Sequence, residues 1–296
     1  MQAKYINPFT DFSFKKIFGE IASKDILIDF LNSLLDLESP IQDLQFQDKE
    51  KLGDNEFDRK AIYDIYCENE KGEKFIVELQ KAKQNYFRER TIYYSTFPIQ
   101  EQAEKGNWNF NLKAIYCVGI LDFIFKESEQ EEPSVVHTIQ LKDQKGKLFY
   151  DKLTYVYIEM PRFQKLEIEL VTRLDKWLYF IQHLEDFDAI PSIFQEKVFE
   201  SAFTKAEIAN LGPNEFNAYE MNLKVYRDYF NTVDTAHQEG IQQGELRGIE
   251  KGIQIGMEKG EYQKALSIAK SLKENGLSIE LISQTTGLSI LEIEAL

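Results

Sequence analysis

The chain has 296 residues, of which 43% are hydrophobic, and it carries a net charge of −15. A general nucleic-acid coat protein would be basic, so this charge excludes that class and confines any phosphate contact to a local patch. The two cysteines, Cys67 and Cys117, have neither zinc-ligand spacing nor the density of a disulfide framework. No apolar run approaches the ~18 residues of a membrane-spanning helix, and the N-terminus lacks a signal-peptide core. We therefore expect a soluble cytoplasmic protein with no membrane partner.

Residues 8–37 show a helical period of apolar side chains that is broken near Gly19. Thr10 or Asp11, at the start of the first helical stretch, can cap the helix. Asp11 and Lys15 are one helical turn apart, and the simplest interpretation is an exposed capping pair. Residues 41–47 then alternate between apolar and polar side chains, which predicts a first strand.

Two further strands joined by a tight turn are predicted at residues 61–66 and 74–79, which are rich in β-branched and aromatic side chains. Residues 69–72 between them supply the polar side chains and the glycine that a hairpin turn requires. Each strand contains an acidic residue, Asp64 in the first and Glu78 in the second. A carboxylate is a poor strand former and is costly to bury unless its charge is compensated.

The hairpin makes these two carboxylates neighbours. If the turn is centred near residues 70 and 71, position 64 lies opposite position 77, give or take one, so Asp64 and Glu78 are within reach of each other. Two such carboxylates repel, so the pKa of one should rise unless a metal lies between them, and oxygen ligands suit Mg²⁺, Mn²⁺ or Ca²⁺. Gln80 follows Glu78 at a spacing of two and projects from the same strand face. A strand with one exposed acidic face explains the carboxylates equally well.

Residues 86–103 predict a helix with an apolar stripe and a basic start. The basic residues at and before this start are Lys81, Lys83, Arg88 and Arg90. A solvated face is the default interpretation of such charges, but cations beside a metal site are what a phosphodiester substrate requires. Residues 112–124 form a nearly continuous apolar run, which predicts a strand buried on both faces. The predicted order is therefore helix, strand, strand, strand, helix, strand.

Three stretches carry a family resemblance: TDFSFKKIFG, IYDIYCENEKGEKFIVELQ and NYFRERTIYYSTFPIQEQAEKG. Together with a glycine-repeat helix near the C-terminus, they resemble the PD-(D/E)XK nuclease-family transposases, also called recombination-promoting nucleases of the Rpn type. The stretches cover most of residues 5–125, and their combination is specific although each alone is not. The resemblance implies an α/β fold with a restriction-endonuclease-like αβββαβ core and a mixed sheet, followed by an all-helical C-terminal region.

The resemblance also assigns roles to matching positions. Asp64 and Glu78 are implied as metal ligands of a metal-dependent DNA endonuclease that serves recombination, mobile elements or defence, with Mg²⁺ (or Mn²⁺ or Ca²⁺) as cofactor. Gln80 takes the place of the family's signature lysine, and its amide can orient a water molecule but cannot supply charge. The remaining implied members are Asp11, as a remote catalytic residue, and Lys15, Arg90 and Tyr93, as phosphate-contacting or supporting groups.

Four regions are predicted from these patterns. Residues 1–170 form the nuclease-like domain. Two added strands, at residues 135–141 and 153–160, are joined by a Lys-Gly-Lys turn and extend its sheet. Residues 171–235 form a helical extension. A glycine-repeat helix follows at 236–262, and a small helical tail at 263–296 resembles half of a helix-turn-helix. The last helix of this tail is acidic, so we interpret the tail as a packing or oligomerisation module.

Glycine recurs every four residues in the repeat, at positions 240, 244, 248, 252, 256 and 260. Each glycine costs a helix about 1 kcal/mol relative to alanine, so the repeat needs a reason. A stripe without side chains lets a second helix backbone approach closely, which predicts a homo-oligomer formed through the C-terminal helices. A flexible linker is the alternative, although such linkers favour Ser and Pro rather than the Glu, Gln, Lys and Ile found here.

Two hypotheses of different classes remain. The first is a metal-dependent DNA endonuclease whose carboxylates hold the metal. The second is a catalytically weak or inactive nuclease fold that acts as a DNA-binding or assembly module, which the glutamine at position 80 and the net charge of −15 favour.

Overall fold

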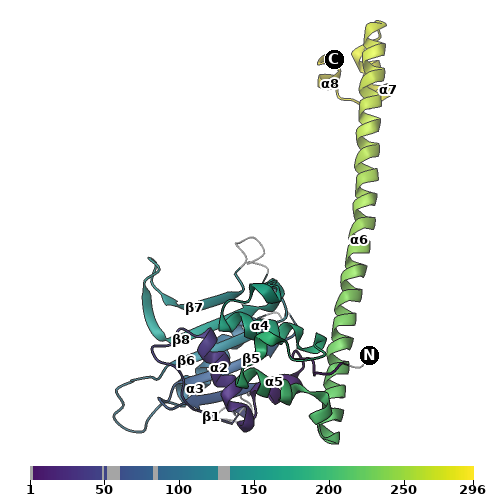
Figure 1. Cartoon of the computed structure of the whole chain (residues 1–296). Helices are drawn as coiled ribbons and strands as arrows, with labels where there is room; N and C mark the ends of the chain where they lie inside the picture. Colours follow the sequence, from purple (N-terminus) through teal and green to yellow (C-terminus); the bar gives the residue numbers. More distant parts are fainter. Residues whose placement is uncertain (1–2, 49, 52–60, 83–85, 126–133) are drawn as a thin grey trace. The chain divides into compact units, whose positions relative to one another are not determined.

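A computed structural model describes residues 3–48, 50–51, 61–82, 86–125 and 134–296, so Lys83 of the predicted basic cluster lies outside the described residues. The chain forms two compact units, Met1–Arg227 and Asp228–Leu296. The helices and strands of both are drawn in Figure 1. Of the helices in the described ranges, none has the length and apolar character that crossing a bilayer requires. The finer four-part division of the chain stays a prediction.

The first unit combines a six-stranded sheet with helices. Its strands are β1 (Leu44–Phe46), β2 (Glu50–Lys51), β3 (Ala61–Ile62), β4 (Ile65–Asn69), β5 (Lys74–Gln80), β6 (Ile115–Leu121), β7 (Val136–Lys142) and β8 (Leu148–Glu159). Its helices are α1 (Asp11–Phe18), α2 (Lys24–Leu34), α3 (Phe87–Gln100), α4 (Arg173–His183), α5 (Lys197–Ala206) and the start of α6 (Pro213–Glu274), with short 3₁₀ turns between several of them.

The sheet is mixed, as predicted, with the strand order β1-β4-β5-β6-β8-β7. The central strands β5, β6 and β8 run parallel to one another, whereas β1, β4 and β7 pair antiparallel with their neighbours. Strands β2 and β3 form a separate two-stranded pair. The central strands β5 and β6 are buried along almost their whole length, which explains the nearly continuous apolar run of β6 and the four apolar residues of β5.

Helices cover both faces of this sheet. The larger core joins one face to α1, α2, α4 and α5, and Trp177 lies fully buried in it against Phe18, Phe30 and Phe199. In Figure 1, α2, α4 and α5 lie on the near side of the sheet. A second, largely aromatic core joins the opposite face to Phe87 of α3. Residues 173–206 therefore share a core with the N-terminal helices.

Several local predictions are confirmed. The N-terminal helical stretch breaks after Phe18, and a 3₁₀ turn separates α1 from α2. The turn between β4 and β5 has Gly72 at a φ of 79°, a left-handed conformation that glycine adopts without steric cost. The backbone amides of Lys71 and Glu73 donate to Asn69 Oδ1 and fix this turn.

Several boundaries differ from prediction, and the strand expected at 41–47 covers only Leu44–Phe46. The strand expected at 61–66 is interrupted, because Asp64 lies in a bend between β3 and β4. The helix expected at 86–103 covers only Phe87–Gln100 and is preceded by Tyr86 at a φ of 62°. The strand expected at 153–160 begins at Leu148, because β8 continues beyond β6 to pair with β7 alone.

Both cysteines lie inside the first unit. Cys67 on β4 and Cys117 on β6 are free thiols that are almost completely buried. Burial raises the pKa of Cys67 to about 12, and burial together with the charge of Glu78 raises the pKa of Cys117 as well. Neither thiol is a candidate nucleophile or metal ligand, because each of these roles requires the thiolate form.

The second unit contains most of α6 together with α7 (Ile279–Thr286) and α8 (Ile290–Glu294). The prediction that residues 236–262 form a continuous helix is confirmed, because α6 runs through them without a break. A small core holds the tail together and consists of Ala269, Ile282, Leu288 and Ile293. Ser278 caps α7 by accepting a hydrogen bond from the amide of Leu281, and Gly287 ends the helix in a left-handed conformation.

Candidate active site

The two predicted carboxylates meet where β4 begins and β5 ends. Ile65 pairs with Val77 across the antiparallel ladder, so the same register continued by one residue places Asp64 opposite Glu78. Asp64 Oδ2 accepts a hydrogen bond of 3.1 Å from the backbone amide of Leu79, the residue after Glu78. The bend that interrupts the predicted strand thus ties Asp64 to the end of β5.

Glu78 is the more buried of the two, with 7% of its surface exposed. Its Oε2 accepts a hydrogen bond of 3.4 Å from Gln80 Nε2, whereas its Oε1 is buried and has no hydrogen-bond partner among the described residues. Burial, and secondarily the charge of Asp64, raises the pKa of Glu78 to about 7, although Arg90, Gln80 and Lys15 oppose the rise. An unsatisfied carboxylate oxygen at this depth is costly unless a proton or a cation compensates it.

The site's two cations come from helices on either side of the sheet. Lys15 on α1 places its Nζ 3.1 Å from Asp64 Oδ1. Arg90 on α3 donates from Nη2 to Gln80 Oε1 over 2.7 Å, and its guanidinium lies against the rings of Phe87 and Tyr94. The predicted proximity of Lys15, Arg90 and Gln80 to the carboxylates is therefore present in the structure.

Asp11 lies apart from this arrangement. Its Oδ1 is 2.9 Å from Lys81 Nζ, and Lys81 directly follows Gln80. Asp11 and Lys15 do not form the exposed pair that their spacing suggested, because each is engaged by a residue near the β4–β5 hairpin. The described part of the chain contains no group of three or more His, Cys, Asp or Glu side chains placed to hold one metal ion. Asp11 as a catalytic residue stays a prediction.

Tyr93 and its neighbour Tyr94 occupy different environments on α3. Tyr93 is 42% exposed, and its ring packs against those of Tyr94 and Phe97. Tyr94 is half-buried, and its pKa is raised by burial and by the charge of Glu78. Tyr94 is thus a tyrosine whose pKa depends on the buried carboxylate of Glu78. Because the two tyrosines are adjacent in the sequence, the sequence did not indicate that Tyr94 would take this position.

Gly119 on β6 is a site residue that sequence analysis missed. It pairs directly with Glu78 in the parallel ladder. A side-chain carbon at this position would lie 2.9 Å from Cδ1 of Tyr157, closer than real contacts allow. Glycine therefore leaves room for the Tyr157 ring over β6, the strand that pairs with β5 at Glu78. The available signal was a single glycine within an otherwise bulky apolar strand, which marks close approach of another group.

Comparison with known proteins gives one match. The family model described as PD-(D/E)XK nuclease family transposase matches residues 8–236. The chain belongs to this family. The matched range includes every predicted site residue from Asp11 to Tyr93. Neither the curated proteins nor the solved structures contain a sequence or fold that matches the chain significantly. Family membership suggests nuclease-like function and agrees with the mixed α/β sheet.

Proposed function

We propose that the protein is a metal-dependent DNA endonuclease that hydrolyses phosphodiester bonds at the Asp64–Glu78 site. The observation that carries this proposal is the buried Glu78 Oε1, which lacks a hydrogen-bond partner among the described residues beside a second carboxylate. The αβββαβ core of the family would correspond to α2, β1, β4, β5, α3 and β6, which occur in this order along the chain.

The residues present fit a hard divalent cation. Asp64 and Glu78 supply carboxylate oxygens, the donors that Mg²⁺, Mn²⁺ and Ca²⁺ prefer, and a bound cation would satisfy the otherwise unpaired oxygen. Such an ion supplies Lewis-acid polarisation of the phosphate and a lower pKa for bound water. Two protein carboxylates leave most coordination positions to water and substrate, as is usual for Mg²⁺.

The neighbouring side chains would orient a water molecule and neutralise the charge of the phosphate. Arg90 holds the amide oxygen of Gln80, so the amide nitrogen is directed to Glu78 and is placed to orient a water molecule. Gln80 brings no charge where the family has a lysine. Lys15 compensates for this, because its ammonium already lies 3.1 Å from Asp64 and its long side chain can turn to an incoming phosphate.

One observation favours the alternative of a weak or inactive nuclease that binds DNA or assembles other components. The Lys15–Asp64 ion pair occupies one of the two carboxylates that a metal would need, and no lysine stands at position 80. A cation at Asp64 would therefore compete with Lys15 for this carboxylate, which weakens metal affinity.

Nicking of supercoiled plasmid tests the proposal. Wild type should nick DNA with Mg²⁺ or Mn²⁺ and not in EDTA, whereas Asp64→Ala and Glu78→Ala should lose the activity. Gln80→Lys should leave activity intact or raise it, and Lys15→Gln should lower it at least tenfold. Glu89→Gln and Lys197→Gln are matched controls, because both side chains are exposed. Cleavage that persists in EDTA or in either alanine variant would refute this mechanism.

A further inference from the structure

The free end of the β7–β8 hairpin extends beyond the sheet, and its exposed side chains do not belong to the core of the first unit. Strand β6 pairs with β8 only from Leu153 to Glu159, so the preceding part of β8 pairs with β7 alone. We call residues 141–150 the distal hairpin. The register between β7 and β8 shifts between Gln140 and Lys142, which marks a bulge that separates the distal hairpin from the sheet.

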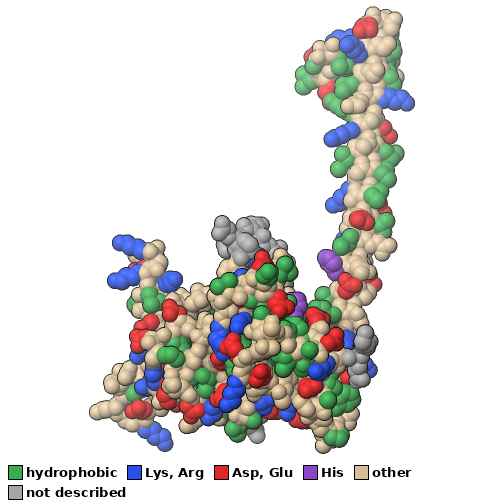
Figure 2. Space-filling model, in the orientation of Figure 1, with side chains coloured by type: hydrophobic (Ala, Val, Ile, Leu, Met, Phe, Trp, Pro, Cys, Tyr) green, Lys and Arg blue, Asp and Glu red, His purple; other side chains and the backbone are tan. Residues whose placement is uncertain are grey.

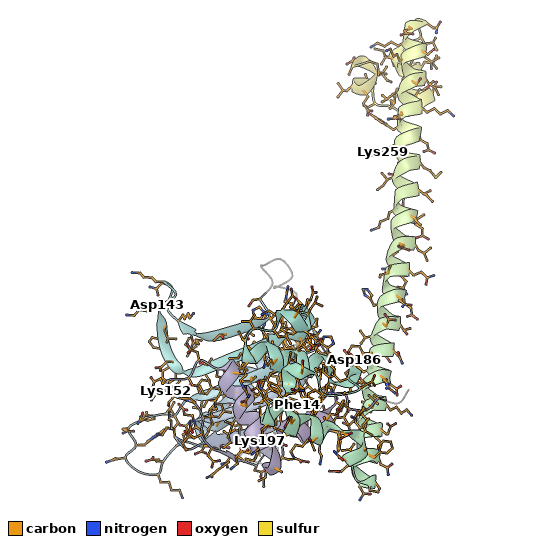
Figure 3. All side chains as sticks on the ribbon, viewed as in Figure 1. Phe14, Asp143, Lys152, Asp186, Lys197 and Lys259 are labelled. Carbon is orange, nitrogen blue, oxygen red and sulfur yellow. The ribbon has the colours of Figure 1, made fainter. Side chains whose placement is uncertain are left out.

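The distal hairpin is basic in an acidic protein. Lys142, Lys145 and Lys147 are exposed, and residues 141–150 contain one acidic residue, Asp143. The carboxylate of Asp143 accepts hydrogen bonds from the backbone amides of residues 145 and 147, so it organises the turn. None of the three ammonium groups has an ion-pair partner in the part of the chain that the structure describes. Figure 2 shows basic side chains gathered at this free end, where Figure 3 places Asp143.

Large apolar side chains accompany the lysines. Phe149 is 80% exposed, and Leu141 and Leu148 are about half exposed. An isolated two-stranded hairpin gains little from exposing such side chains to water. Lysines alone could serve to protect a sheet edge from aggregation, but a neighbouring exposed phenylalanine works against that purpose.

We infer that the distal hairpin is a DNA-binding arm, in which the three lysines contact phosphates and Phe149 enters a groove of the duplex. A two-stranded ribbon fits the major groove, which is about 12 Å wide, and apolar side chains contact thymine methyl groups or insert between base steps. The lysines suit the phosphate backbone, and DNA is already the substrate that the proposed function gives to this unit. This inference rests on the proposed function, because it identifies how the same substrate is held.

The hairpin also has a suitable length. Tyr157 pairs with Gly119, which pairs with Glu78, and it lies seven residues along β8 from Tyr150, the nearer end of the distal hairpin. At about 3.3 Å per residue the distal hairpin begins about 23 Å along β8 from the position level with Glu78. One turn of B-DNA is about 34 Å long. A duplex whose scissile phosphate lies at the site would therefore meet the arm within about one helical turn.

Fluorescence anisotropy with a labelled 30-base-pair duplex, at several salt concentrations in EDTA, tests the arm without cleavage. Lys142→Gln, Lys145→Gln and Lys147→Gln are combined in one full-length variant. The matched control combines Lys105→Gln, Lys197→Gln and Lys224→Gln, which removes the same charge from exposed positions elsewhere in the unit. Figure 3 places Lys197 away from Asp143.

The arm variant should bind at least tenfold more weakly at about 100 mM salt, and its slope of log affinity against log salt should fall by roughly 2–3, as expected for three lost phosphate contacts. Phe149→Ala should weaken binding without changing the slope. Equal affinities and slopes for the arm and control variants would overturn the inference, as would an arm variant that binds DNA normally but changes its oligomeric state in sedimentation.

The same variants separate this inference from the proposed function. At saturating protein, the arm variant should nick plasmid at the wild-type rate, because the Asp64–Glu78 site is intact. If wild type binds DNA through the arm but never nicks it, the endonuclease proposal fails and the arm stands. If wild type nicks DNA and the arm variant has unchanged affinity, the arm fails and the endonuclease proposal stands.

Discussion

The two compact units of the chain differ in how far their apolar side chains are buried. In the first, residues 1–227, both faces of the central sheet are covered by helices, and side chains such as Trp177 and Phe75 are fully buried. In the second, residues 228–296, the core is confined to the tail, while Ile249, Ile253 and Met257 on α6 are each about 60% exposed. The six repeat glycines of α6 face open space.

The first unit thus buries its large apolar side chains within one chain, whereas the repeat region of α6 leaves its apolar side chains exposed. The sheet positions its acidic site because packing on both faces holds β4, β5 and β6 in register. The repeat glycines have no atom within 4 Å of where a side chain would start, and we predict that a second helix covers the exposed apolar residues between them. Stability of the first unit should therefore be sensitive to single core changes, whereas the repeat should respond through association.

The largest effect is expected for Trp177→Ala. This side chain packs against Phe18, Phe30 and Phe199, and its Nε1 donates to Asp29, so the truncation should cost about 3–5 kcal/mol of unfolding free energy. Urea unfolding followed by circular dichroism measures the loss. Ile249→Ala is the matched change on α6 and should alter stability by no more than about 0.5 kcal/mol. Equal effects would remove the contrast between the units.

Glu78→Gln should impair the site but stabilise the first unit. The folded-state pKa of Glu78, about 7, lies above the unfolded value of 4.5, so its contribution to stability is fully present below pH 4.5 and is lost as the pH rises through 7. Glu78→Gln should remove this dependence and raise stability at pH 8, in EDTA, by on the order of 3 kcal/mol.

Tryptophan fluorescence during urea unfolding reports this change, because Trp108 and Trp177 both lie in the first unit. The variant and wild type should differ little at pH 4 and most at pH 8. The exposed Glu89→Gln serves as the control and should follow wild type at every pH. A Glu78→Gln variant that is no more stable at pH 8 would show that the site tolerates its buried charge without a metal.

The glycine repeat is tested by Gly248→Leu combined with Gly252→Leu. Leucine should raise helix propensity by about 0.8 kcal/mol per site and block close approach of a second backbone, so the variant should become monomeric while α6 stays helical. Analytical ultracentrifugation and circular dichroism measure both quantities. The corresponding alanine pair should retain association better. If wild type is itself a monomer, the repeat is a spacer and not an interface.

The smallest effect is expected at the cap of α7. Ser278→Ala removes the side chain that accepts from the Leu281 amide and should cost about 1 kcal/mol. Hydrogen exchange of the α7 amides should accelerate correspondingly. Ser267→Ala, within α6 and exposed, is the matched substitution and should stabilise by a few tenths of a kcal/mol. Identical responses at the two serines would indicate that the tail is not held by its cap.

Much of the first unit could be predicted from the sequence because its patterns are local. The turn at Asn69–Gly72 fixes the register of β4 and β5, and that register alone places Asp64 near Glu78. The apolar run that became β6 has the composition of a strand buried on both faces. The family match, over residues 8–236, spans these same elements.

The remaining features depend on contacts between distant segments, which spacing does not encode. Lys15 approaches Asp64 only because α1 folds against the sheet, and Asp11 is drawn to Lys81 for the same reason. Their separation of one helical turn indicated a local pair instead. The early start of β8 was also hidden, because the distal hairpin has exposed apolar residues and lysines in place of a clear alternation.

The two buried thiols give the first unit a built-in reporter of its own opening. Cys67 and Cys117 lie in the cores on opposite faces of the sheet, and their raised pKa values leave almost no thiolate in the folded protein. Alkylation must therefore wait until the sheet opens. Because Asp228–Leu296 contains no cysteine, the labelling rate would follow fluctuations of the sheet alone, even while the long helix frays or exchanges partners.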